Sequence, residues 1–159
     1  MSKKYTIEID IPNGKEIDFE KSTLTSIVFK DMKPIIKWND MYGGVEINAD
    51  GEHFIIDGKN PTAVCNWYAA KQYASEPNDN WKLPTIKQLQ VLAKYFDEID
   101  NVITDNNGFN LINGRYWTCE KEDKFNTRYV FISNGHNDNG FTGTDSNRVS
   151  SYMRSVCPL

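Results

Sequence analysis

The sequence predicts an α+β fold, with a main domain over residues 36–159 and a short β-rich segment over residues 1–35 before it. Three observations lead to this class. Apolar and polar residues alternate over Tyr5–Ile11, as they do in a half-buried strand. An Asp50–Gly51 pair between two apolar runs is typical of a β-hairpin. After Thr85, apolar residues recur at the spacing of an amphipathic helix.

The segment of residues 1–35 contains two candidate strands, Tyr5–Ile11 and Ile27–Phe29, with the turn-forming Pro12–Gly14 directly after the first. A pair of strands is not stable by itself. We expect the segment to pack on the rest of the chain, on copies of itself or on another protein. It would then anchor or oligomerise the chain.

The first part of the main domain predicts a hairpin followed by a helix. The hairpin joins Gly44–Asn48 to His53–Ile56. Asn60 followed by Pro61 is typical of a helix start, because proline suits the first helical position. Apolar residues at helical spacing extend this first helix to about Ala74.

The second predicted helix has the clearest start. Thr85 and Gln88 stand at the spacing of a capping box, in which each side chain accepts the other residue's backbone N–H. The apolar stripe of this helix consists of Ile86, Leu89, Leu92 and Phe96. No further helix is predicted, because the chain beyond Phe96 is rich in loop-forming residues through Gly108.

The sequence pattern of the late part of the chain predicts three strands and one long loop. The strands are Arg115–Cys119, Arg128–Ile132 and Val149–Cys157. Between the second and the third, Asn134–Asn147 is composed almost entirely of small polar residues, with Phe141 as its only large apolar side chain. Such a composition predicts an exposed surface loop.

Composition excludes few classes of function. The 159 residues carry 18 Lys+Arg against 22 Asp+Glu, which disfavours a protein that binds nucleic acid by neutralising phosphates. No run approaches the roughly 18 apolar residues of a membrane span, and no targeting segment precedes Tyr5. We expect a protein that is made in a cytosol and stays soluble without inserting into a membrane, unless a signal peptide has been lost.

The three cysteines, Cys65, Cys119 and Cys157, are too few for a disulfide scaffold and lack the spacing of a zinc site. Reduced and mostly buried thiols are the favoured interpretation, and a Cys65–Cys157 bridge is the alternative. Cys119 and Cys157 lie in candidate strands, where packing is their expected role.

Four short motifs follow one another along the main domain. They are W-K-L-P-T at Trp81–Thr85, Y-W-T at Tyr116–Thr118, V-F-I-S-N-G at Val130–Gly135 and M-R-S-V-C at Met153–Cys157. This ordered set resembles the bacterial and phage family of C-type lectin-like domains marked by W-[RK]-L-P-T. That family is related to the C-terminal domain of a collagen-like bacterial adhesin and, more distantly, to formylglycine-generating enzyme. The resemblance covers about Trp38–Leu159 and implies a C-type lectin-like fold with two helices, antiparallel sheets and a long late loop.

Large side chains are expected to fill the core of this domain. The expected core residues are Trp67, Trp81, Leu83 and Trp117. Trp81 and Leu83 stand just before the capped helix, and Trp117 stands in a predicted strand. The position of Trp38 is left open.

Residues Ile9–Asp18, Ser22–Leu24 and Ile27–Lys30 resemble a leader found on short structural proteins of phages that infect gut Bacteroidetes. This second resemblance implies that the protein is part of a virion. Virions assemble in the host cytoplasm and leave by lysis, so an adhesin-type domain on them needs no secretion signal. The leader would anchor or oligomerise the protein on the particle through contacts with other virion proteins.

The late loop holds the candidate ligand-binding residues, because insertions between the late strands build the ligand face of the lectin-like fold. The candidates are His136, Asn137, Asp138, Asn139, Phe141, Asp145 and Arg148. Amide, carboxylate and ring groups of this kind suit a sugar or protein ligand, which they contact by hydrogen bonds and stacking.

No metal site and no cofactor are expected. E-P-N at Glu76–Asn78 and W-N-D at Trp38–Asp40 are the tripeptides that bind calcium and sugar in C-type lectins, but here each precedes the helix it should follow. Calcium needs about six to eight oxygens that converge on one point, so displaced fragments do not make a site. The late loop is rich in oxygen ligands without the periodic pattern of an EF-hand, and calcium binding there stays open.

Three arginines on or beside the late strands, Arg115, Arg128 and Arg154, are expected to form structural ion pairs. Their expected partners are Glu120, Glu122 and Asp123, and a ligand carboxylate is the alternative. No motif of a serine hydrolase, metalloprotease, P-loop or dinucleotide-binding enzyme is present in the sequence. We therefore expect no enzymatic activity.

Together these inferences predict a non-enzymatic phage virion structural protein, a fibre or capsid-decoration component. Its lectin-like domain would bind a glycan or protein ligand on the host or mucosal surface, and the chain would form a homo-oligomer. Two alternatives stay open. One is a purely architectural module that contacts only other virion proteins, and the other is a bacterial surface adhesin with a trimmed signal.

Overall fold

The computed structural model describes residues 15–17, 29–31, 33–76, 80–134 and 139–159. The chain divides into two compact units, Met1–Lys33 and Pro34–Leu159. This division falls two residues before the predicted domain boundary at residues 35 and 36. The anchoring role of the first unit stays a prediction.

The described part of the first unit is a pair of short strands. β1 (Lys15–Ile17) pairs antiparallel with β2 (Phe29–Asp31). The strand predicted at Tyr5–Ile11 lies outside the described residues, and the one predicted at Ile27–Phe29 shares only Phe29 with β2. β1 has no predicted counterpart, because its three residues are too few to show an alternating pattern.

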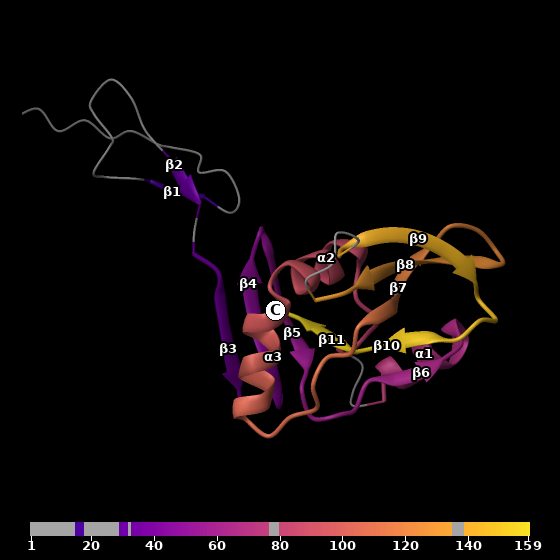
Figure 1. Cartoon of the computed structure of the whole chain (residues 1–159), viewed down its shortest axis with the longest axis horizontal. Coiled ribbons are helices and arrows are strands. Elements are labelled where there is room, and N and C mark those ends of the chain that lie inside the picture. Colours follow the sequence, from indigo (N-terminus) through magenta and orange to yellow (C-terminus); the bar gives the residue numbers. More distant parts are fainter. Residues whose placement is uncertain (1–14, 18–28, 32, 77–79, 135–138) are drawn as a thin grey trace, which may run out of the picture. The chain divides into compact units, whose positions relative to one another are not determined.

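The second unit contains a four-stranded antiparallel sheet in the order β11-β5-β4-β3 (Figure 1). Its strands are β3 (Ile35–Asn39), β4 (Gly44–Ala49), β5 (Glu52–Asp57) and β11 (Val156–Pro158). The predicted hairpin is confirmed as β4 and β5. Asp50 and Gly51 between them have φ angles of 51° and 80°, because a two-residue hairpin turn that matches the twist of its strands needs positive φ at both positions.

A five-stranded sheet in the order β6-β10-β7-β8-β9 carries most of the late strands. They are β6 (Ala63–Cys65), β7 (Gly114–Lys121), β8 (Asn126–Ile132), β9 (Phe141–Ser146) and β10 (Ser151–Met153). β10 and β7 run parallel, and the other neighbours are antiparallel. The strands predicted at Arg115–Cys119 and Arg128–Ile132 are confirmed as β7 and β8, while the expectation of antiparallel pairing alone is wrong.

Two predictions for the late chain need correction. The predicted loop Asn134–Asn147 is wrong over Phe141–Ser146, which form β9 at the edge of the sheet. Small polar residues suit an exposed edge strand as well as a loop, so composition alone did not separate the two. The predicted strand Val149–Cys157 is in fact two strands, β10 and β11, which belong to different sheets.

Arg154 lies where the chain passes from one sheet to the other. Its side chain is only 2% exposed, and burial lowers its pKa from the ordinary arginine value. Its guanidinium donates to the carbonyl oxygens of Asp57, Asn60, Phe109 and Asn110, at 2.6–3.1 Å. The predicted partner, a carboxylate among residues 120–123, is therefore wrong for this arginine, which holds together the loops after β5 and before β7.

The first helix, α1 (Trp67–Ala74), begins later than predicted. Its N-cap is Asn66, whose Oδ1 accepts the Ala69 N–H at 3.0 Å. Residues 63–65 form β6 instead, because their pairing with β10 overrides the helical spacing of the side chains. Asn60 is not a helix cap; its backbone and side-chain amides donate to Asp57.

The second helix, α2 (Ile86–Lys94), confirms the capping box. Thr85 Oγ1 accepts the Gln88 N–H at 3.1 Å, and Gln88 Oε1 accepts the Thr85 N–H at 3.0 Å. A third helix, α3 (Phe96–Asp105), was not predicted, and Phe96 belongs to it rather than to α2. In the described residues, no helix is long and apolar enough to cross a membrane.

The five-stranded sheet is covered on both faces. On one face, apolar residues of β7 and β8 join those of α2, α3, β4 and β5 in the larger core. On the other, Trp67 and Ala70 of α1 pack against Trp117 and Met153. The side chains predicted for the core, Trp67, Trp81, Leu83 and Trp117, are at most 5% exposed. The indole N–H groups of Trp67 and Trp117 donate to backbone carbonyls of β7 and β6.

Candidate functional site

Three neighbouring strands, β7, β8 and β9, carry a partly exposed group of aromatic side chains and one arginine. Arg115 stands opposite Phe131, and Phe131 stands opposite Phe141, so the three side chains project from the same face of the sheet. Two positions away, Tyr129 stands opposite Gly143 on that face. We call Arg115, Tyr129, Phe131 and Phe141 the aromatic–arginine face.

Residues of β9 hold Arg115 and Tyr129 in place. Arg115 Nη1 donates to Asp145 Oδ2 at 2.6 Å, and the guanidinium carbon lies 5.6 Å from the centre of the Tyr129 ring, within the range of a cation–π interaction. The Tyr129 ring lies across Gly143, where a Cβ atom would stand 2.4 Å from Tyr129 Oη. Glycine at this position therefore leaves room for the ring.

The phenylalanine side of the face is open to solvent. Phe141 is 61% exposed, and Phe131 is half-buried. A hollow of about 280 Å³ adjoins the face. Its lining residues are Val64, Gly114, Arg115, Phe131, Ser150, Ser151 and Tyr152. An exposed ring, a guanidinium group and a shallow hollow are thus combined on one side of the sheet.

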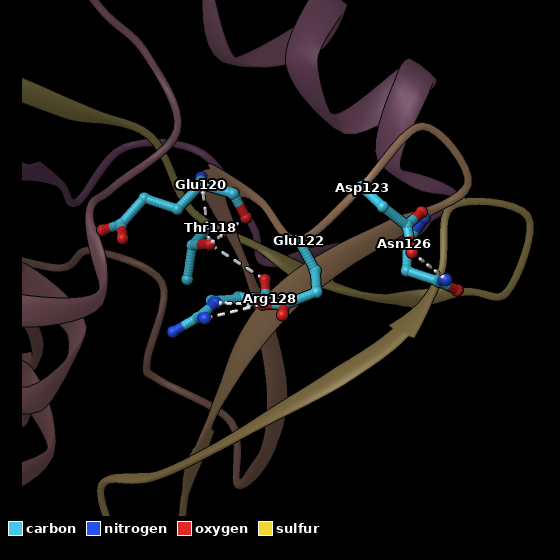
Figure 2. Close-up of polar contacts among 6 residues, drawn as sticks. All are labelled: Thr118, Glu120, Glu122, Asp123, Asn126 and Arg128. Carbon is cyan, nitrogen blue, oxygen red and sulfur yellow. Dashed lines mark hydrogen bonds and ion pairs between the residues drawn. The ribbon is translucent and has the colours of Figure 1, made fainter.

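Polar contacts fix the turn between β7 and β8 (Figure 2). Arg128 Nε donates to Glu122 Oε2 at 2.6 Å, which confirms the predicted pairing of this arginine. Asp123 accepts the backbone N–H groups of Phe125 and Asn126 and the side-chain amide of Asn126. The Asn126 side chain is the main cause that lowers the pKa of Asp123 from its ordinary value.

The register of β7 and β8 shifts in the second half of β7. There Thr118 Oγ1 donates to the carbonyl oxygen of Arg128 at 2.9 Å and accepts the Glu120 N–H at 3.2 Å (Figure 2). The Glu120 carboxylate accepts the Ile86 N–H at 2.8 Å, at the start of α2. These contacts tie the strand that carries Arg115 to a helix and to its neighbouring strand.

Only some of the predicted ligand-binding residues lie in the described part of the chain. His136, Asn137 and Asp138 lie outside it. Asn139 makes internal contacts: Oδ1 accepts the Ser133 N–H at 3.0 Å, and Nδ2 donates to the Ala93 carbonyl at 2.6 Å. Its amide thereby joins the segment before β9 to the end of α2.

The structure places Phe141 and Asp145 on the same face of β9. Asp145 is paired with Arg115, so it supports the aromatic–arginine face by orienting the guanidinium. Arg148 lies in the turn after β9, where its backbone N–H donates to Ser146 Oγ at 3.4 Å. The ligand-binding role of these three predicted residues stays a prediction.

Sequence reasoning did not assign Arg115, Tyr129 and Phe131 to a binding face. Arg115 was expected to pair with a carboxylate among residues 120–123, and its partner is Asp145 instead. The sequence did contain a signal for two of them. Tyr129 and Phe131 stand two residues apart in a predicted strand, and such residues share a face.

The W-N-D tripeptide spans the end of β3 and the start of the turn to β4. Trp38 Nε1 donates to Asp40 Oδ1, and Asn39 Nδ2 donates to Glu46 Oε2, both at 3.1 Å, which stabilises the connection of β3 to β4. Glu76 follows α1, and the rest of E-P-N lies outside the described residues. In the part of the chain that the structure describes, no three His, Cys, Asp or Glu side chains form a group that could hold a metal ion.

All three cysteines are free thiols, so the alternative of a Cys65–Cys157 bridge is wrong. Cys157 is buried, Cys65 is half-buried and Cys119 is exposed. Loss of hydration raises the pKa of each thiol from its ordinary value. The thiols are therefore protonated near neutral pH and weakly nucleophilic.

Comparison with models of known protein families finds no match to this chain, and comparison with curated proteins finds none either. What the aromatic–arginine face can do therefore follows from its own chemistry. An exposed phenyl ring stacks on the apolar face of a sugar or on another side chain, and a guanidinium group donates hydrogen bonds to hydroxyl or carboxylate oxygens.

Proposed function

We propose that this chain is a non-enzymatic structural protein of a phage virion, a fibre or capsid-decoration component, whose Pro34–Leu159 unit binds a ligand on the host or mucosal surface. The ligand is a glycan or a protein. The observation that carries the proposal is the aromatic–arginine face, in which the ring of Phe141 is largely exposed on the same sheet face as Arg115.

The positions of the family motifs support a C-type lectin-like fold for this unit. W-K-L-P-T leads directly into the capped helix α2, Y-W-T lies in β7, and M-R-S-V-C runs from β10 into β11. α3 and β9 depart from the expected arrangement of two helices and one long late loop. Along the chain, β9 nevertheless comes between the late strands β8 and β10, where this family builds its ligand face.

The aromatic–arginine face suits weak contacts that are repeated many times. Phe141 and Tyr129 offer ring surface, Arg115 offers hydrogen-bond donors, and the adjoining hollow of about 280 Å³ is small. A multivalent particle amplifies weak single-site binding through its high effective concentration. The Met1–Lys33 unit, whose sequence resembles a phage leader, would attach the chain to the particle or oligomerise it.

A matched pair of arginine variants tests the proposal. Arg115 and Arg128 are 45% and 44% exposed, and each lies 2.6 Å from a carboxylate oxygen. They project from opposite faces of the same sheet, because Arg128 alternates with Tyr129 along β8. Arg115→Met and Arg128→Met therefore remove equivalent ion pairs, one inside the proposed binding face and one outside it.

The measurement is binding of the multimerised full chain to a glycan array and to host cells. We expect Arg115→Met to weaken binding about tenfold or more, and Arg128→Met to change it by less than about twofold, because central contacts dominate binding energy. An unmodified multimer that binds neither array nor cells rejects the proposal. Equal losses in the two variants reject the assignment of the face.

A purely architectural virion module is the second candidate function. It is favoured by Met41 and Phe125, which are 86% and 67% exposed in the β3–β4 and β7–β8 turns. Exposed apolar tips of this kind can contact neighbouring virion proteins. If Met41→Ser or Phe125→Ser prevents particle assembly while particles that carry Arg115→Met adsorb normally, the architectural function replaces the first proposal.

A further inference from the structure

A cavity of about 500 Å³ lies between α1, the end of β7 and the segment before α2. It is lined by Trp67, Lys71, Ser75, Trp81, Lys82, Leu83, Cys119 and Lys121. It shares no residue with the aromatic–arginine face. Its volume falls within the range of small-molecule sites, about 300–1,000 Å³.

The inner surface of this cavity is apolar. Trp67, Trp81 and Leu83 are 5%, 5% and 2% exposed, so only small parts of their side chains remain open. The indole N–H of Trp67 is already committed to the Thr118 carbonyl at 2.9 Å. Trp67 and Leu83 therefore offer ring and aliphatic surface to a ligand.

Three lysines line the same cavity. Lys121 Nζ lies 4.4 Å from the centre of a Trp67 ring, and Lys71 Nζ lies 5.7 Å from it. Within the described residues, Lys71, Lys82 and Lys121 form no ion pair. Three lysines outside the cavity do pair with carboxylates on or beside β4 and β5, namely Lys37, Lys87 and Lys94. The nearby Glu120 carboxylate accepts the Ile86 N–H at the start of α2. The lining thus carries three positive charges without a paired carboxylate.

Cys119 is the exposed thiol of the lining. Loss of hydration is the main cause that raises its pKa, and Glu120 adds to the effect. A neutral thiol leaves the positive charge of the lysines uncompensated. It also provides a chemical reporter inside the cavity, because alkylation of its small thiolate fraction requires open space around the sulfur.

We propose that this cavity binds a small organic anion whose apolar body lies against Trp67, Trp81 and Leu83 and whose anionic group lies between the lysines. Three lysine ammonium groups beside apolar side chains favour such a molecule over an uncharged one of the same shape, because each of them attracts the anionic group by Coulomb interaction. The cavity is separate from the aromatic–arginine face, so an experiment can reject one proposed binding site without rejecting the other.

Two fluorescent probes that differ in one charged group test this inference. Anilinonaphthalene sulfonate carries an aromatic body and a sulfonate, and phenylnaphthylamine has the same rings without the sulfonate. In titrations of the full chain, we expect the anionic probe to bind at least about tenfold more tightly. Lys82→Gln and Lys121→Gln should each weaken its binding about fivefold, the size of one charge contact near the surface. Lys37→Gln and Lys87→Gln remove the same charge outside the cavity and should change binding by less than about twofold.

Alkylation of Cys119 by iodoacetamide, followed by mass spectrometry of the cysteine peptides, locates the bound probe. Saturating anilinonaphthalene sulfonate should slow modification of Cys119 at least about threefold, as expected when most copies of the site are occupied. Arg115→Met should leave both readouts unchanged. Equal affinity for the two probes, unchanged binding in both cavity variants, or probe binding that leaves Cys119 alkylation unaltered would each overturn the proposal.

Discussion

The two sheets of the Pro34–Leu159 unit differ in what they leave exposed. In the four-stranded sheet, Val45, Ile47, Phe54 and Ile56 are completely buried. In the five-stranded sheet, Phe141 is 61% exposed, although it stands in a strand with a regular register. A buried aromatic residue contributes to folding, whereas an exposed one in an ordered strand is available for binding. The comparison separates the buried central strands, which form the scaffold, from the edge strand β9, which presents side chains.

The largest expected effect comes from truncating one phenylalanine in each sheet. Phe54→Ala should lower the free energy of unfolding by about 3–5 kcal/mol, because it removes buried contacts and leaves a cavity. Phe141→Ala should change it by less than about 0.5 kcal/mol, because most of that ring is already in water. Urea unfolding followed by circular dichroism measures both values. Similar losses in the two variants would contradict the division between scaffold and binding surface.

Arg154 connects the loops that lead out of one sheet and into the other. Arg154→Met should lower the free energy of unfolding by about 3 kcal/mol, because buried carbonyl oxygens lose their donors while methionine keeps most of the volume. The carbonyls concerned belong to residues 57, 60, 109 and 110. Denaturant unfolding gives the loss, and hydrogen exchange should show faster opening around those loops. Unchanged exchange there would contradict the connecting role.

A smaller effect is expected at the start of α2, the helix that packs in the larger core with strands of both sheets. Thr85→Ala removes the hydroxyl that accepts the Gln88 N–H, and it should lower the free energy of unfolding by about 1 kcal/mol. Thr85→Ser keeps the acceptor and serves as the control, with most of the stability retained. If both variants lose the same amount, the capping hydrogen bond is not the cause.

The smallest expected change in stability depends on pH and comes from a carboxylate on the four-stranded sheet. His53 Nε2 lies 3.1 Å from Glu46 Oε1, and this hydrogen bond is the main cause that lowers the pKa of Glu46. Because the folded-state value lies below the unfolded-state value, the carboxylate stabilises the fold at neutral pH, and this contribution is lost as the pH falls through the folded-state pKa. Glu46→Gln should cost less than about 1 kcal/mol at pH 7.

The difference in melting temperature between Glu46→Gln and the unmodified chain should shrink as the solution is made acidic. Protonation of Glu46 then removes from the unmodified chain the charge that the variant already lacks. Melting temperatures measured from neutral pH to below the ordinary glutamate pKa give the profile. A difference that stays constant across this range would show that Glu46 acts through packing and not through its charge.

Local sequence signals predicted the elements that local contacts specify. Asp50–Gly51 marked the β4–β5 hairpin, and Thr85 with Gln88 marked the start of α2, because each feature is decided within a few residues. α3 also carries a local signal, since Phe96, Ile99 and Ile103 are buried at helical spacing. This helix was not predicted because polar residues surround these apolar positions. In addition, α3 begins only two residues after α2 ends, so Phe96 was taken as part of the α2 stripe.

The remaining differences have long-range causes. Asn60–Pro61 has the sequence of a helix start, yet residues 63–65 pair with β10, nearly ninety residues later. Arg115 pairs with Asp145 across β8, so no short window of sequence contains both residues. The aromatic–arginine face therefore became visible only through the strand register. Of its four residues, only Phe141 was among the predicted ligand-binding residues, and Asp145, the partner of Arg115, was another of them.

The central claim is that the aromatic–arginine face binds a surface ligand. Adsorption of the multimerised full chain to host cells tests it directly with two exposed phenylalanines, Phe141 on that face and Phe125 in the β7–β8 turn, which are 61% and 67% exposed. We predict that Phe141→Ala reduces adsorption about tenfold or more, as expected for a central contact residue, and that Phe125→Ala leaves it unchanged. Full adsorption by Phe141→Ala, or the same loss in both variants, would contradict the claim.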